Sequence, residues 1–147
     1  MSEQNYKNHT RFVPLFHFVA LPIIIGLLIG SGMGLAHACG DYSNHAAFHN
    51  AILFFATSVA LMLVYFFART FALKAQDRAI RAEENFRHFI LTGKPLDSRL
   101  RLRQIIALRF AGDDELAALA KQAAEEGLSS KQIKMMVKNW RADRYRV

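Results

Sequence analysis

The sequence predicts an all-α protein: a two-helix transmembrane hairpin whose second helix extends into a small cytoplasmic three-helix module. Three observations predict this fold. The 57 residues between Arg11 and Arg69 contain one formally charged side chain, Asp41. From Arg69 onward the chain is basic, with 17 of its 19 Lys and Arg residues. Helix-capping and helix-stopping residues divide that second part into short helices, and no strand is predicted.

Each of the two apolar stretches is long enough to cross a bilayer. A helix needs about 20 apolar residues, rising about 1.5 Å each, to cross a hydrocarbon core about 30 Å thick. Two spans cannot close a barrel, so both must be helices. The expected parts are a cytoplasmic arm (1–12), a first transmembrane helix (13–35), an external loop (36–49), a second transmembrane helix (50–68), a cytoplasmic helical extension (69–92) and a basic helical module (93–147).

The orientation follows from the positions of Lys and Arg. Lys7 and Arg11 precede the first span, the loop between the spans has neither residue type, and the other 17 follow the second span. Because cytoplasmic segments retain such residues, both termini are expected in the cytoplasm. In the rival interpretation the first span is a secretory signal, since residues 36–38 resemble a cleavage site. Its apolar run is longer than a typical signal core, and an acidic residue, Glu3, precedes it.

The first span carries glycines at steps of four, Gly26, Gly30 and Gly34, and the second carries Ala56 and Ala60 at the same step. Residues four apart share a helix face, and small residues there let another helix backbone approach closely. Two interpretations remain open. The small faces pack against each other within the hairpin, or they bind a second copy or a larger membrane complex.

Proline and glycine mark two further features of the helices. Pro22 lacks a backbone donor and lies inside the first span, so a kink is expected near Phe18. After Arg69 nothing interrupts the helical pattern before Gly93. The second transmembrane helix is therefore expected to continue to about Thr92.

Helix-capping and helix-stopping residues in the basic module predict three helices. Asp97 and Asp113 are expected helix caps, Gly127 is a stop, and Ser129 with Gln132 forms a capping box for a last helix that ends near residue 141. Apolar side chains at helical spacing supply a small core. The predicted core residues are Leu100, Ile105, Ile106, Phe110, Leu116, Leu119 and Ala123, with Ile133, Met136, Val137 and Trp140 on one face of the last helix.

Three histidines in or beside the external loop, His37, His45 and His49, are candidate metal ligands. His45 and His49 are four apart and could share a helix face, a spacing that can bind zinc, copper or nickel. No HExxH or CxxC pattern accompanies them. The alternative is a neutral polar loop that crosses the membrane easily, and no cofactor is predicted. With Cys39 alone, the chain has no internal disulfide.

The basic residues of the module admit three kinds of partner. They attract anionic lipid headgroups, they bind nucleic acid if residues 119–137 form a helix-turn-helix, or they dock an acidic protein. Segment 119–137 has small and glycine residues at helix-turn-helix positions. The candidate contact residues are Arg99, Arg101, Arg103, Lys131, Lys134, Lys138 and Arg141.

No pattern of catalysis is present in the sequence. It has no glycine-rich phosphate loop, no nucleophile elbow and no pair of carboxylates within a span. The expected role is therefore non-catalytic: a membrane accessory or scaffold protein that associates through its glycine face, as a homo-oligomer or as a subunit of a larger complex. The alternative is a membrane-anchored helix-turn-helix regulator, and a third candidate is a small transport or metal-handling protein.

Several short segments resemble an uncharacterised family of small two-span bacterial membrane proteins. They are EQNYKNH (3–9), LTGK (91–94), ALRFA (107–111), KNW (138–140) and YRV (145–147). The resemblance extends over nearly the whole chain. It implies two spans and a location in the bacterial inner membrane, and it transfers no catalytic residues.

Overall fold

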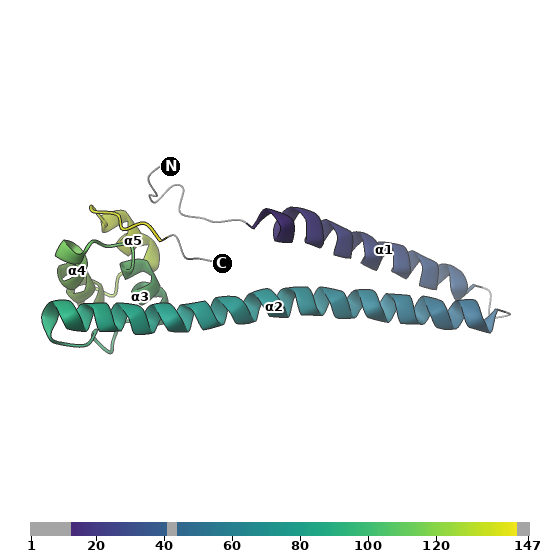
Figure 1. The fold of residues 1–147 in the computed structure, drawn as a ribbon, viewed down its shortest axis with the longest axis horizontal. Helices are drawn as coiled ribbons and strands as arrows, with labels where there is room; N and C mark the ends of the chain where they lie inside the picture. The colour runs from purple at the N-terminus through teal and green to yellow at the C-terminus, as the bar shows by residue number, and fades with distance from the viewer. Residues whose placement is uncertain (1–12, 41–43, 144–147) are drawn as a thin grey trace. The chain divides into compact units, whose positions relative to one another are not determined.

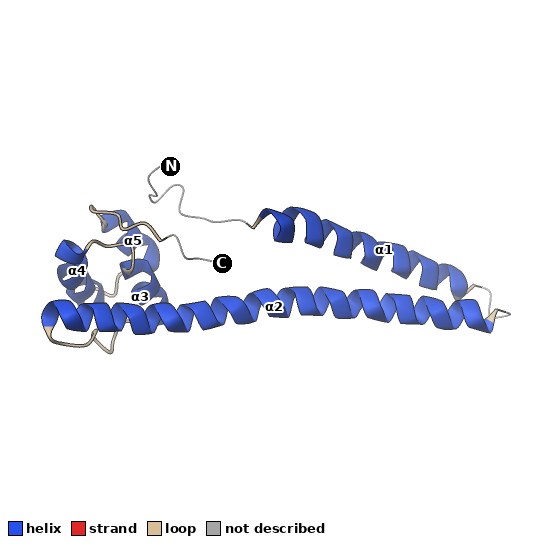
Figure 2. Cartoon of the chain, in the orientation of Figure 1, coloured by secondary structure: helices blue, strands red, loops and turns tan. Residues whose placement is uncertain are grey.

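The computed structural model describes residues 13–40 and 44–143, and within these ranges all regular structure is helical (Figures 1 and 2). The chain divides into two compact units, Phe12–Ala72 and a second unit that contains Leu73–Val147. One isolated antiparallel bridge pairs Ala111 with Trp140. The elements in chain order are η1 (Leu15–Ala20), α1 (Leu21–Ala38), α2 (His45–Thr92), α3 (Leu102–Leu108), α4 (Asp113–Glu125) and α5 (Ser130–Met136).

The first helix begins with a π-helical turn, η1, where the sequence predicts a kink. Pro22 has no N–H, and in an α-helix its ring would clash with the carbonyl of Phe18. The chain widens instead, and the Leu21 N–H bonds the carbonyl of Phe16, five residues earlier. The position of the predicted distortion is therefore correct. Its form is a short π-helix that ends before Pro22 and avoids the clash of the proline ring.

Helix α2 is a single helix of 48 residues. It begins at His45, before the predicted start of the second span at residue 50, because the Asn44 side chain accepts a hydrogen bond from the Ala47 N–H at 3.0 Å. Helix α1 likewise continues to Ala38. Hydropathy alone does not detect such caps, so the predicted loop 36–49 was too long. The far end agrees with prediction, since α2 ends at Thr92 and Gly93 follows with φ of +70°.

Helices α3, α4 and α5 gather beside the last turns of α2 (Figure 1). They enclose an apolar core whose largest fully buried side chains are Phe110, Leu108, Leu116 and Ile133. Six of the seven predicted core residues in the segment 100–123 are buried, and Ile106 is half-buried. Gly127 with φ of +63° ends α4, and the Ser129–Gln132 capping box opens α5, both as predicted.

The predicted cap at Asp97 is wrong. Its carboxylate accepts a hydrogen bond from the Arg99 N–H at 2.9 Å and forms an ion pair with the Arg99 guanidinium. These contacts close a turn and do not start a helix. Helix α3 starts only at Leu102 and ends at Leu108. Gly112 is the N-cap of α4, so Asp113, the other predicted cap, is its first helical residue.

The predicted last helix, to about residue 141, is also wrong because α5 ends at Met136. The carboxylate of Glu115 on α4 accepts the Lys138 and Asn139 N–H groups, at distances from 3.1 to 3.2 Å. These bonds satisfy backbone donors that an additional helical turn would have used. Trp140 then stacks on the Phe110 ring, with centroids 4.6 Å apart.

Candidate functional site

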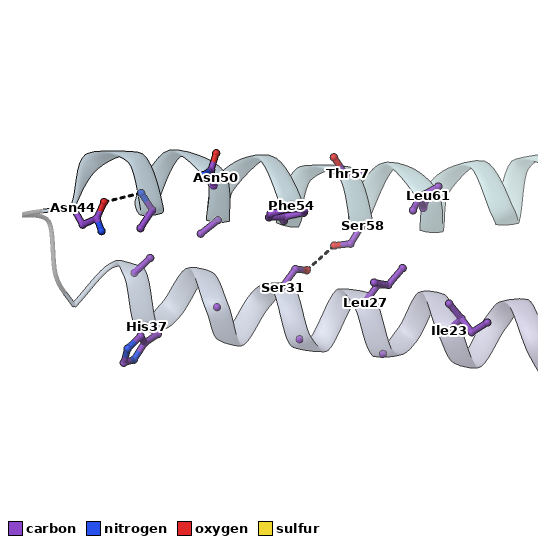
Figure 3. A pocket seen from close by; sticks show the side chains of 16 residues that line it. Ile23, Leu27, Ser31, His37, Asn44, Asn50, Phe54, Thr57, Ser58 and Leu61 are labelled. Carbon is purple, nitrogen blue, oxygen red and sulfur yellow. Dashed lines mark hydrogen bonds between the residues drawn. The ribbon is translucent and has the colours of Figure 1, made fainter.

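Within the unit Phe12–Ala72, α1 and α2 meet through small and polar side chains. The hydroxyl oxygens of Ser31 and Ser58 are 2.9 Å apart and hydrogen-bonded (Figure 3). Ser58 is only 3% exposed. A Cβ at Gly32 would lie 3.5 Å from the Phe55 ring, so this glycine belongs to the contact. The two helices are therefore in contact through a hydroxyl pair and through a glycine that faces an aromatic ring, and small and hydroxyl residues of this kind are common between membrane helices.

A second contact joins Tyr65 on α2 to the π-turn. The Tyr65 hydroxyl donates to the Phe16 carbonyl at 3.0 Å, and the two rings stack with centroids 4.0 Å apart. The guanidinium carbon of Arg69 lies 5.5 Å from the Phe16 centroid. Tyr65 thus contacts η1 through both a hydrogen bond and a ring stack, and no spacing in the sequence predicts this pairing.

A groove of about 840 Å³ runs between the two helices, and Ser31 and Ser58 are among the residues that line it (Figure 3). The predicted glycine face forms its wall on α1, since Gly26, Gly30 and Gly34 all line it. A Cβ built on any of the three meets no atom within 4 Å. Figure 3 shows Phe54 and Leu61 along the α2 wall. The glycines therefore face open space and not α2.

Ala56 and Ala60 are exposed and lie outside this groove. The structure thus does not bring the small faces of the two helices together. The face of α1 that meets α2 carries Ser31, which bonds Ser58, and glycine spacing does not reveal this contact.

The histidines lie around the ends of α1 and α2. His37 lines the groove, and His45 and His49 are exposed in the first turns of α2. Among residues 13–40 and 44–143, no group of three His, Cys, Asp or Glu side chains lies close enough to hold a metal ion. Asp41, the one acidic residue of the predicted loop, lies outside the described residues.

In the second unit, three of the predicted basic residues converge on one hollow of about 460 Å³. Arg99, Arg101 and Arg103 line it together with Ser129 and Ser130. Their alternation explains the convergence, because Leu100 between the first two is buried in the core and the arginines are exposed. Three cations and two hydroxyls at one surface hollow suit an anion such as a phosphate.

Arg99 also has an intramolecular partner at the rim of this hollow. Its guanidinium lies 2.7 Å from the Asp97 carboxylate. The side-chain hydrogen bond from Arg99 lowers the pKa of Asp97 from 3.8 to about 2. Asp97 therefore stays ionised at all physiological pH values, and the hollow's net positive charge rests mainly on Arg101 and Arg103.

The basic residues of the predicted recognition helix are dispersed. Lys131 and Lys134 lie on α5, which has seven residues, whereas Lys138 and Arg141 follow its end. The Lys134 ammonium lies 5.4 Å from the centroid of the Phe110 ring. Arg141 pairs with Glu84 at 3.7 Å. The residues that would read a groove in DNA therefore do not share one helix face.

Arg87, on α2, connects this helix to the module. It bonds Glu84 at 2.9 Å, Asp113 at 2.6 Å and the Ala111 carbonyl at 2.7 Å. Glu84 is itself buried. A guanidinium that satisfies two carboxylates and a carbonyl ties α2 to the start of α4.

Comparison with known proteins gives one match. The sequence model of a family of unknown function (DUF6526) matches residues 1–147. No curated protein and no solved structure matches the chain.

Proposed function

The chain belongs to the family of unknown function DUF6526, and we propose that it is a non-catalytic integral membrane protein of the bacterial inner membrane that acts as an accessory or scaffold subunit. It is held in the bilayer by α1 and the first part of α2. It binds another membrane helix through the glycine groove and anionic lipid or a partner protein through the basic module.

The membrane location is supported by length and by outward-facing apolar side chains. Two helices, Leu15–Ala38 and His45–Thr92, are long and apolar enough to cross a membrane. Along them Phe54 is 71% exposed and Val64 is 63% exposed. Exposing a continuous belt of such side chains to water would be unfavourable by about 25 cal/mol per Å². In lipid the same belt carries no such penalty.

The proposed orientation is a hairpin with both termini in the cytoplasm. Its support is the absence of Lys and Arg between residues 12 and 68 and their abundance from Arg69 onward. Tyr65, Phe66 and Phe67 precede Arg69 within one helical turn or slightly more, the order expected where a helix leaves the bilayer through its headgroups.

The main support for binding another subunit is the empty space in front of Gly26, Gly30 and Gly34. A Cβ built on any of these glycines meets no atom within 4 Å, so another helix can approach the α1 backbone closely along this wall. Because lipid is as apolar as a helix side chain, close backbone packing is what favours a helix over lipid there. The proposed occupant is therefore a transmembrane helix of another subunit.

The basic module contributes the second half of the proposal. Arg101 and Arg103 are exposed, and each Lys or Arg near an anionic surface contributes about 1 kcal/mol. A DNA-binding role is the weaker alternative, because the module's other basic residues are dispersed and partly paired.

The test of the assembly role is the mass of the protein solubilised in mild detergent with the proteins that co-purify. Gly30→Leu fills the groove and should release the partner. Ile29→Leu, one residue away and outside the groove, is the matched control. Loss of the complex in the first variant alone is the expected outcome. An unchanged mass in both variants would contradict the role of the groove.

A further inference from the structure

The part of α2 that belongs to the second unit has two unlike faces. One face carries Ile80 and Glu84, both buried against the module. The other face carries an apolar strip, which we call the seam: Ala75, Ala79, Ala82, Phe86 and Phe89. All five are exposed, and Phe86 and Phe89 are 64% and 50% exposed. The seam is thus an exposed apolar helix face, and at Ala82 it borders a hollow that is also lined by Leu96 and Leu100 of the module.

The spacing along the seam is that of a coiled coil. Its residues follow one another at steps of four, three, four and three, and Ala68 and Ala72 precede them in the same rhythm. This repeat averages 3.5 residues per turn, which keeps a strip in contact with a second helix of the same repeat when the two supercoil left-handedly. The alanines allow close approach, and the two phenylalanines supply most of the apolar area.

Charged residues flank the seam in complementary positions. In the heptad defined by the seam, Arg78 occupies position g and Glu83 occupies position e. In a parallel two-stranded coil, g of one helix faces e of its partner five residues later. Arg78 and Glu83 are five apart, opposite in charge and exposed, and neither forms an ion pair with another described residue.

These features identify the occupant as the same segment of another molecule. A second copy offers the same repeat and the reciprocal charges, so the Arg78–Glu83 pair would form twice about a two-fold axis. Two copies inserted in one membrane in the same sense can only align in parallel. The parallel orientation is the part that rests on the proposed membrane topology.

We propose that residues 75–89 of α2 form a parallel, two-stranded coiled coil with residues 75–89 of a second copy of this chain.

Cysteine cross-linking of the full-length protein in membranes tests the seam. Cys39→Ser removes the native thiol, and Ala82→Cys places a new one at a core position of the coil. Arg81→Cys, one residue away on an exposed face, is the control. Mild oxidation should give a covalent dimer with Ala82→Cys and little or none with Arg81→Cys. Equal yields, or a cross-link to a protein of different mass, would overturn the proposal.

Charge exchange tests the register and the parallel orientation. In the Ala82→Cys background, Arg78→Glu or Glu83→Arg alone places like charges opposite each other, and each should lower the dimer yield about threefold. The two changes together restore opposite charges and should restore the yield. A double variant that cross-links no better than the single variants would contradict the parallel register.

Two further variants separate this proposal from the glycine groove. Phe86→Glu should weaken association through the seam roughly 100-fold, because two large apolar surfaces are lost at one interface. It should leave the fluorescence of Trp140 unchanged, since Phe86 is exposed and does not belong to the module core. Gly30→Leu should leave the Ala82→Cys cross-link intact even if the groove proposal fails. A cross-link insensitive to Phe86→Glu would overturn the seam.

Discussion

The two units of this chain distribute polar and apolar side chains in opposite ways. In the unit Phe12–Ala72 the large apolar side chains face outward, and the buried positions include Ser58 and Tyr65. In the unit that contains Leu73–Val147, Phe110, Leu108 and Leu116 are fully buried and most charged side chains face outward. The two units thus bury opposite kinds of side chain, and this difference supports the proposal that the first unit lies in lipid and the second in water.

The largest expected effect is the loss of a core side chain in the second unit. Leu116→Ala should lower the free energy of unfolding of the module by about 3 kcal/mol, because it removes buried methyl groups and leaves a cavity. Ile29→Ala, at an outward-facing position of α1, should not affect that unfolding. Denaturant titration followed by fluorescence of Trp140, which stacks on Phe110, measures both. Equal effects would contradict the division into two burial rules.

A second test concerns the buried charge in the water-exposed unit. Arg87→Ala leaves the Glu84 carboxylate buried without its closest cation, and should destabilise the module by about 3 kcal/mol. Arg87→Ala combined with Glu84→Leu removes both charges and should recover part of that loss. The same Trp140 titration measures the three proteins. A double variant as unstable as the single one would show that the lost contacts to Asp113 and Ala111 dominate.

In the first unit, polar contacts are expected to have smaller effects. Tyr65→Phe removes the hydroxyl that donates to the Phe16 carbonyl but keeps the ring stack. The carbonyl retains its bond from the Leu21 N–H. The expected loss of stability is therefore about 0.6 kcal/mol, the average for interhelical hydrogen bonds in membranes. Unfolding in mixed detergent micelles measures it, and a loss of several kcal/mol would contradict this estimate.

The smallest predicted effect is a pH dependence at the rim of the basic hollow. The pKa of Asp97 is lowered from 3.8 to about 2 in the folded protein, chiefly by the side-chain hydrogen bond from Arg99. A lowered pKa means that folding favours the ionised form, so this contribution is present above pH 4 and lost as the pH falls toward 2. Asp97→Asn should flatten the dependence of stability on pH in that window. An unchanged slope would show that other carboxyl groups set it.

Local signals predicted much of the fold. The long helix ends at Thr92 because Gly93 adopts a positive φ, and α5 begins where the Ser129–Gln132 box predicts. The errors have two origins. Asp97 binds Arg99, two residues later, and closes a turn, so a residue typical of a helix start has a competing local partner. Glu115 lies more than 20 residues before the backbone N–H groups that it accepts after α5, and local spacing does not reveal such a partner.

The predictions for the candidate sites were also partly correct. The predicted contact residues Arg99, Arg101 and Arg103 do line one hollow. Glycine spacing did not reveal which face of α1 meets α2, where Ser31 bonds Ser58, 27 residues later. Arg109 is only 6% exposed and pairs with Asp143 at 3.1 Å, so it does not belong to the exposed basic residues.

The claim of two solvents is tested most directly by thiol labelling in intact cells with a maleimide that does not cross membranes. Three single-cysteine proteins suffice: native Cys39, Val64→Cys and Ser98→Cys, the last two with Cys39→Ser. The account predicts that Cys39 is labelled in intact cells and Ser98→Cys only after lysis. Val64→Cys should be labelled in neither sample, although Val64 is 63% exposed on the helix surface. Ready labelling of Val64→Cys would place that helix in water and contradict the account.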